Sequence, residues 1–74
     1  MHDKIQDILN TYPERTQIII KMRYGLGGKN DPEEYFQEHT LEEIGAYLGI
    51  TRERVRQIEK QTLADIRQKW DGSF

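Results

Sequence analysis

The sequence contains no cysteine, only two prolines and no long hydrophobic run. Without cysteine it has neither a disulfide framework nor thiolate chemistry, a composition that suits a reducing cytoplasm. The longest aliphatic run, Ile18–Ile20, lies in a charged segment and is far short of the about 18 apolar residues that a membrane span needs. No signal peptide is evident. We therefore expect a soluble, cytoplasmic protein with no membrane segment.

Residues that carry catalytic or metal chemistry are also scarce. His2 and His39 are isolated and lack metal-ligand spacing. The glycine cluster 25–28 lacks the preceding strand, the lysine and the Ser/Thr of a phosphate-binding loop. The sequence therefore predicts no catalytic residue, no metal, no cofactor and no enzyme activity. With 74 residues the chain is long enough for one domain, 1–74, and we expect a module or fragment that works with partners.

Charge is distributed unevenly along the chain. The formal net charge of −2 argues weakly against nucleic acid as a partner. Segment 29–39, however, has four acidic residues against one lysine, whereas segment 52–60 has four basic residues against two acidic ones. An acidic loop thus hides a locally basic segment in the total charge.

Apolar periodicity and capping residues indicate helices. They predict four, over about residues 3–10, 13–24, 41–48 and 51–70. Pro13 suits the first turn of the second helix, and Gly25 can end it in a left-handed conformation. Thr40 and Glu43 form a capping-box pattern, and Thr51 is a good N-cap. The predicted fold class is all-α: a four-helix domain with a C-terminal helix-turn-helix and without winged elements.

The acidic connector, residues 25–40, is rich in turn residues. Within it, 33–38 has the composition of a helical turn, which would let Tyr35 and Phe36 pack back on the core. The sequence leaves three alternatives open for segment 27–39: an ordered flap, a partner site or a disordered loop.

Residues 41–58 have the pattern of two helices joined by a tight turn. Gly45 removes a side chain where the helices cross, and Gly49 permits a positive φ in the turn. The apolar residues that fill the wedge between the helices are Ile44, Leu48, Ile50, Val55 and Ile58. The pattern favours a helix-turn-helix, and the alternative is a plain helical hairpin with no DNA role.

On a helical wheel the last helix has two faces. The core arc is Val55, Ile58, Thr62, Ile66 and Trp70, and the opposite face is Glu53, Gln57 and Lys60, flanked by Arg54, Arg56 and Gln61. A helix in the major groove presents its N-terminal residues to base edges. Arginine suits guanine, glutamine suits adenine, and glutamate accepts from the cytosine amino group. The alternative is a solvated charged face.

Two runs in this region, 40–45 and 51–59, closely resemble region 4 of the sigma-70 family of bacterial RNA polymerase initiation factors, in its primary-like group. Segments 13–15 and 22–26 resemble the earlier part of that region, so that the likeness covers about residues 5–70. It implies a domain that reads the promoter −35 element on double-stranded DNA while bound to core RNA polymerase.

The resemblance also implies roles for individual residues. The base-reading set is Arg52, Glu53 and Gln57. The DNA-backbone set is Arg15, Arg23, Leu41, Glu42, Thr51, Arg54, Arg56 and Lys60, where Arg54 lies by the backbone or at a base edge. The surface for the flap of the polymerase β subunit is Ile5, Ile8, Leu9 and Ile19, for which a simple core role is the alternative.

Two departures from the family pattern stand out. The connector is longer than usual and acidic, and Gln61, Ala64 and Asp65 occupy turns that are usually more basic and meet activators. An anti-sigma factor or an activator is a further candidate partner. The alternative function is a protein-interaction module, stand-alone or of phage type, that binds polymerase or a regulator with little DNA reading. A generic helix-turn-helix regulator would need to dimerise, but we see no dimer helix and expect a monomer when free.

Overall fold

The structure is a computed structural model that describes the backbone of residues 2–70 and the side chains of residues 6–69. Its elements are α1 (His2–Leu9), α2 (Glu14–Tyr24), the short 3₁₀ helix η1 (Glu33–Phe36), α3 (Leu41–Leu48) and α4 (Arg52–Trp70). No strand occurs within residues 2–70. The predicted all-α class is confirmed, and the four α-helices begin and end within one residue of their predicted limits. None of the helices in this part of the chain combines the length and apolarity needed to cross a membrane.

The helices end where local chemistry stops them. Gly25 and Gly49 adopt left-handed φ values of 66° and 73° after α2 and α3. The Thr40 hydroxyl accepts from the Glu43 N–H, and the Glu43 carboxylate accepts from the Thr40 N–H, which completes the predicted capping box. The Thr51 hydroxyl accepts from the Arg54 N–H at the start of α4. Each cap satisfies backbone groups that a helix end leaves without an intrahelical partner.

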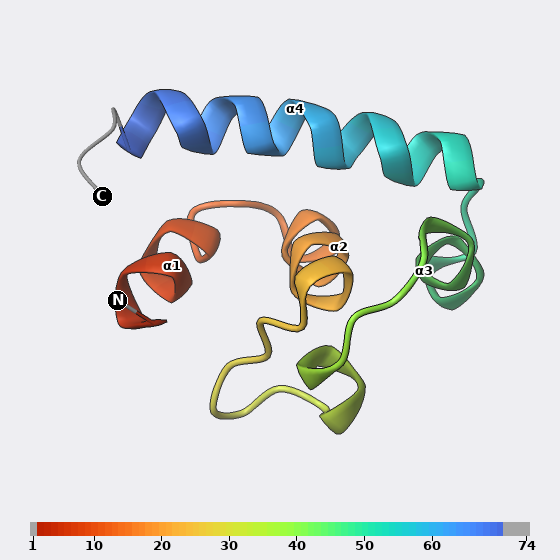
Figure 1. Cartoon of the computed structure of the whole chain (residues 1–74), viewed down its shortest axis with the longest axis horizontal. Coiled ribbons are helices and arrows are strands. Elements are labelled where there is room, and N and C mark those ends of the chain that lie inside the picture. The colour runs from red at the N-terminus through yellow and green to blue at the C-terminus, as the bar shows by residue number, and fades with distance from the viewer. Residues whose placement is uncertain (1, 71–74) are drawn as a thin grey trace.

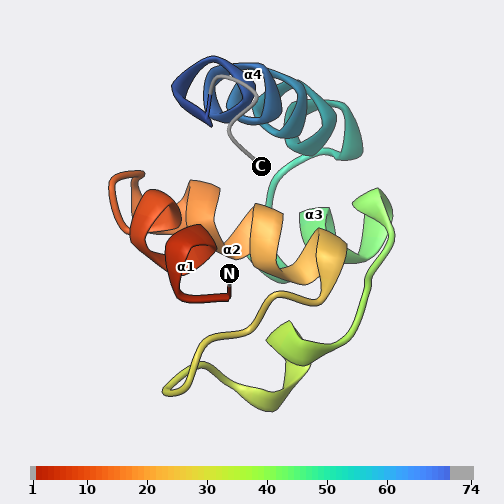
Figure 2. The same cartoon turned by 60° about the vertical axis from the view of Figure 1, so that its left-hand side comes forward.

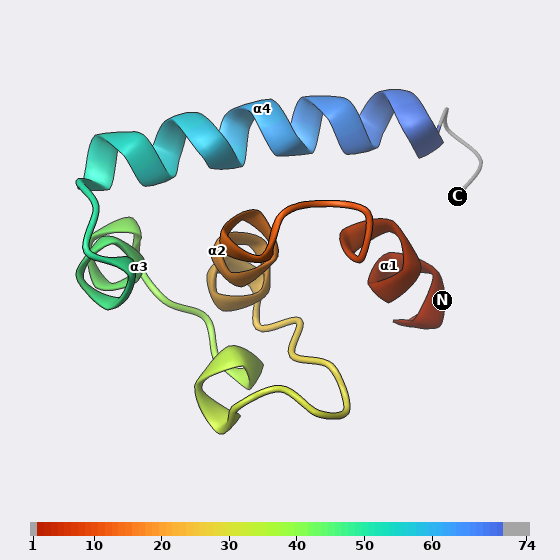
Figure 3. The ribbon, with the colours of Figure 1, turned by 180° about the vertical axis from the view of Figure 1, so that it is seen from behind.

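The molecule is layered around α2. Helix α4 runs along one side, with α1, α2 and α3 beneath it, and the connector with η1 lies on the far side of α2 (Figures 1 and 3). Helix α2 packs on α3, α4 and η1. The buried core consists of Leu9, Ile19, Ile20, Met22, Tyr35, Ile44, Val55 and Ile58. The long α4 therefore has one face on this core and one directed away from it (Figure 2).

The acidic connector is an ordered flap, which decides against a disordered loop. The Lys21 ammonium lies 2.7 Å from an Asp31 carboxylate oxygen. The Gly27 N–H donates to the Tyr35 carbonyl, and the His39 N–H donates to the Met22 carbonyl. Tyr35 is buried, as predicted, but Phe36 is half exposed and only leans over Gly27. The predicted helical turn forms, as a 3₁₀ helix.

Candidate nucleic-acid interface

The turn between α3 and α4 depends on the absence of a side chain at Gly45. A Cβ atom there would lie 2.7 Å from the Ile50 carbonyl oxygen, closer than such contacts occur. The Ile50 N–H in turn donates to the Gly45 carbonyl at 2.9 Å. The chain thus returns closely against α3 before α4 begins, which is the geometry that the sequence pattern predicted for a helix-turn-helix.

Helix α4 has the two faces predicted from the wheel. Val55, Ile58 and Thr62 are buried, with 0%, 8% and 6% of their surface exposed, and Ile66 is half-buried. The side chain of Trp70, the last member of the predicted arc, lies outside the described residues. On the other face Glu53, Gln57 and Lys60 are exposed, as are Arg54, Arg56 and Gln61. The core thus fixes which side of α4 faces outward.

The three residues predicted to read bases share one exposed region. Arg52, Glu53 and Gln57 are all exposed and lie in the first two turns of α4. Val55 and Ile58, which lie between and after these residues in the sequence, are buried. Their packing fixes the rotation of α4 about its axis. The region offers guanidinium and amide donors, and carboxylate and amide acceptors, at the N-terminal end of α4. In helix-turn-helix proteins this end of the second helix contacts base edges.

Glu53 is held by a neighbour on its own helix. Arg56 donates from Nε at 3.0 Å and from Nη2 to the two oxygens of the Glu53 carboxylate. The hydrogen bonds from Arg56, with the charge of Arg52, lower the pKa of Glu53. The carboxylate therefore stays ionised and acceptor-only, as reading a cytosine amino group requires. The paired arginine also reduces its repulsion from phosphate.

Several of the residues predicted to meet the DNA backbone lie at helix starts. Leu41 and Glu42 occupy the first turn of α3 and Thr51 caps α4, while Arg15 is exposed in the first turn of α2. Helix N-termini present N–H groups and a positive dipole end to anions. Glu42, Thr51 and Arg15 are exposed and Leu41 is half-buried.

Arg23, also predicted to meet the backbone, has an internal role. Its Nη1 donates to the His39 carbonyl at 3.0 Å, and its Nε lies 3.5 Å from a Glu59 carboxylate oxygen. The Tyr24 hydroxyl donates to the same Glu59 oxygen at 2.6 Å. Glu59 thus ties the end of α2 to α4. Sequence reasoning missed it because its partners are far away in the sequence.

The predicted polymerase-facing residues fall into different environments. Leu9 and Ile19 are 1% and 0% exposed, so the prediction that they contact a partner is corrected: they fill the core. Ile8 is half-buried and keeps some surface. Ile5 belongs to α1, but its side chain lies outside the described residues. Within the described part of the chain, no group of three or more histidine or carboxylate side chains is arranged to hold a metal ion.

This arrangement agrees with a known family. The sequence profile of sigma-70, region 4, matches residues 8–68. The chain belongs to the sigma-70 region 4 family. This family is one of transcription factor domains and not of enzymes, which supports the prediction of no enzyme activity. The predicted helix-turn-helix is thereby confirmed.

Similar proteins are RNA polymerase sigma factors, and HrdD is named as a principal sigma factor. HrdD of Streptomyces griseus is 41% identical over 66 residues, which cover 89% of this chain and 18% of that protein. SigA of a Bacillus species is 36% identical over 67 residues, covering 90% of this chain and 16% of SigA. The chain therefore spans less than a fifth of the length of these relatives. Their names fit the primary-like group that the motifs indicated.

Proposed function

We propose that this region 4 domain recognises the promoter −35 element in the major groove during transcription initiation. The observation that carries the proposal is the exposure of Arg52, Glu53 and Gln57 together in the first two turns of α4. That helix is anchored by buried Val55 and Ile58, so its reading face has one orientation.

Each exposed group has a defined task in this proposal. The Arg52 fork donates to guanine, Gln57 pairs with adenine and the Glu53 carboxylate accepts from a cytosine amino group. Phosphates are held by Arg15, Arg54 and Lys60 and by the amides that begin α3 and α4, which set the register. Arg56 supports base reading by pairing with Glu53. Arg23 supports it by connecting the end of α2 to His39 and to Glu59 of α4.

We also propose that the domain binds the flap of the RNA polymerase β subunit through the surface of α1 and α2. Leu9 and Ile19 are excluded because they are buried. Among the predicted flap residues whose side chains the structure describes, this leaves Ile8, which is half-buried and keeps some exposed surface. Substitution of Ile8 by aspartate should abolish capture by an isolated β-flap fragment while helix content stays the same. If Ile8→Asp leaves capture by the β-flap fragment unchanged, the proposed contact with the polymerase is wrong.

Base reading is tested with two variants on a −35 duplex and a scrambled duplex at defined low salt. Gln57→Ala is expected to cost about 1–3 kcal/mol of discrimination between the duplexes, and Glu53→Ala to relax the preference at a different base pair. Non-specific affinity should change less than specific affinity, because neither residue is a cation that neutralises phosphate.

Lys60→Gln is the control, since it removes a charge without removing a base contact. It should weaken binding to both duplexes about equally. Equal affinity of the unchanged protein for both duplexes, with both alanine variants silent, would rule out base reading. That result would favour the alternative, a protein-interaction module.

A further inference from the structure

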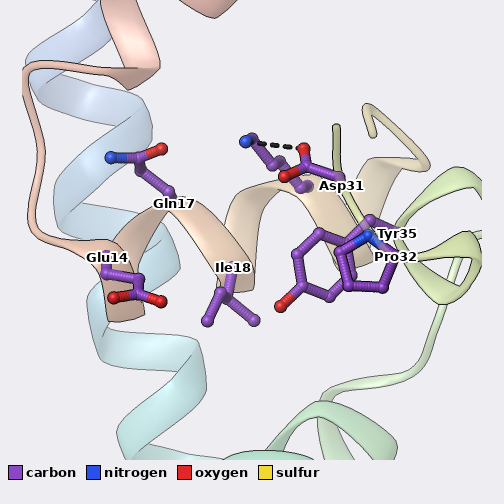
Figure 4. Close-up of a pocket in the computed structure, with 7 residues that line it drawn as sticks. Glu14, Gln17, Ile18, Asp31, Pro32 and Tyr35 are labelled. Atoms are coloured by element: carbon purple, nitrogen blue, oxygen red, sulfur yellow. Dashed lines mark ion pairs between the residues drawn. The ribbon is translucent and has the colours of Figure 1, made fainter. Parts of the chain in front are cut away.

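The connector and α2 form a groove whose lining includes none of the residues proposed to contact DNA. It has a volume of about 340 Å³. Figure 4 shows Glu14, Gln17 and Ile18 projecting from α2 on one side, and Pro32 and Tyr35 of the connector on the other. The groove is therefore a product of the ordered connector.

An ion pair and hydrogen bonds hold the walls of the groove in place. Asp31 accepts from the Lys21 ammonium at 2.7 Å and from the Gly28 N–H at 2.6 Å, and the ion pair is the dashed line in Figure 4. The Tyr35 N–H donates to the Pro32 carbonyl, and its side chain is 7% exposed. A groove that is formed before a ligand arrives loses less entropy on binding.

The uncompensated charge around the groove is negative. Lys21 lines it but is neutralised by Asp31, which leaves the exposed Glu14 without a cation among the lining residues. A second hollow, of about 230 Å³, is lined by Glu33, Glu34 and Gln37, and Glu33 directly follows the lining residue Pro32 in the chain. Burial, the Tyr47 hydroxyl and the charges of Asp31 and Glu14 together raise the pKa of Tyr35. The groove thus has an apolar side chain on each wall, Ile18 and Pro32, and an acidic rim, which we define as Glu14 with the exposed η1 carboxylates Glu33 and Glu34.

We propose that this groove docks a segment of another protein that carries a lysine or arginine beside an apolar side chain. The cation would lie between Glu14 and the carboxylates of η1, and the apolar side chain would cover Ile18 and Pro32. The volume is at the lower end of ligand pockets and suits one or two side chains. The acidic rim repels nucleic acid, and Asp31, committed to Lys21, is not available to a metal ion.

The groove and the DNA-reading face lie on different sides of the domain. Helix α2 separates the connector from α4 in every view (Figures 1, 2 and 3). A basic segment in the groove therefore leaves the outer face of α4 open. The inference does not depend on the proposed −35 recognition, and the two can fail separately.

The test is a selection of peptides from a display library of random 12-residue sequences on the 74-residue chain. Selected peptides are then measured against two variants that each neutralise two exposed carboxylates. Glu14→Gln with Glu33→Gln alters the rim, whereas Asp7→Asn with Glu38→Gln makes the same charge change at residues that do not line the groove. We expect enrichment of lysine or arginine beside an apolar residue. Affinity should fall about tenfold in the rim variant alone, the combined effect of two exposed ion pairs.

Three results would overturn the proposal. The first is a selection without enrichment of basic residues, and the second is equal affinity of the selected peptides for both variants. The third is peptide binding that MgCl₂ abolishes but NaCl at equal ionic strength does not, which would indicate a cation site. Circular dichroism of both variants checks that they are folded. Binding of the −35 duplex serves as an independent measurement, and the rim variant should change it no more than the charge-matched Asp7→Asn/Glu38→Gln variant does.

Discussion

Gly45 and Gly49 serve the same turn for different physical reasons. Gly45 has no room for a Cβ atom, because the Ile50 carbonyl oxygen would lie 2.7 Å from it. Gly49 has open space around it, but its backbone φ is 73°, a conformation that residues other than glycine adopt only at an energetic cost. One position is limited by packing and the other by backbone conformation.

This difference gives a prediction at the residue scale. Gly45→Ala should destabilise the domain by about 1–3 kcal/mol through overpacking. Gly49→Ala should cost about 1–2 kcal/mol through left-handed strain. Gly49→Asn should recover part of that loss because asparagine tolerates the left-handed region, whereas Gly45→Asn should be worse than Gly45→Ala. Urea unfolding monitored by circular dichroism measures all four, and recovery at both positions would contradict the assignment.

Residue-level features were predictable from the sequence when their causes were local. The Thr40–Glu43 capping box, the helix stops at Gly25 and Gly49 and the outward face of α4 depend on neighbours within a turn or two. The Lys21–Asp31 and Arg23–Glu59 ion pairs bring together distant parts of the chain, so local patterns contain no signal for them. Apolar periodicity likewise placed Leu9 and Ile19 on helices but did not distinguish a core position from a partner surface.

Among the elements, the connector was the least predictable. Its glycines, prolines and carboxylates have the composition of a solvated loop, and one helical turn was the most that its pattern indicated. Its order comes from three contacts with α2: the Lys21–Asp31 ion pair, the packing of η1 with Tyr35 in the core, and the hydrogen bond from the His39 N–H to the Met22 carbonyl. Tertiary contacts, and not local propensity, therefore decide its conformation.

Asp31 makes the connector sensitive to pH. Burial disfavours its charge, but the hydrogen bonds from Lys21 and the Gly28 N–H outweigh this effect and lower its pKa. A carboxylate whose pKa is lower in the folded state stabilises that state above its ordinary pKa of about 3.9, and the stabilisation is lost as pH falls through the folded value. Asp31→Asn should therefore cost about 1–3 kcal/mol at pH 7, and this cost should shrink as pH falls below about 3.9.

The measurement is the free energy of unfolding in urea for both proteins between pH 7 and pH 2.5. Asp7→Asn, at an exposed carboxylate on α1, is the matched control and should run parallel to the unchanged protein. If the free energies of unfolding of Asp31→Asn and the unchanged protein differ by the same amount at every pH, the Lys21–Asp31 ion pair does not stabilise the fold through the charge of Asp31.

At the scale of the whole molecule, the net charge of −2 limits affinity for DNA. Binding must rely on the few cations around α4, and we expect the free domain to bind a −35 duplex weakly. Lys60→Gln should reduce the slope of log affinity against log salt concentration by about 0.9, the effect of one phosphate contact. Its discrimination between −35 and scrambled duplexes should stay the same.

Lys69→Gln is the matched control on the same helix. Lys69 lies 4.6 Å from the centre of the Tyr12 ring and 3.5 Å from an Asp65 carboxylate oxygen, near the far end of α4. Its substitution should leave the salt slope unaltered. Equal slopes for both variants would mean that Lys60 does not contact phosphate.

The position of the acidic connector has a consequence for the encounter with DNA. The connector lies on the far side of α2 from α4 (Figure 1). Because the connector is acidic and α4 carries exposed arginines, the domain has an electric dipole moment. Near a polyanion, this dipole experiences a torque that turns α4 toward the duplex and the connector away from it. Screening confines the torque to separations of about 10 Å at 0.1 M salt, so it acts in the final approach. The carboxylates that lower the overall attraction to DNA thus help to select the orientation in which it is met.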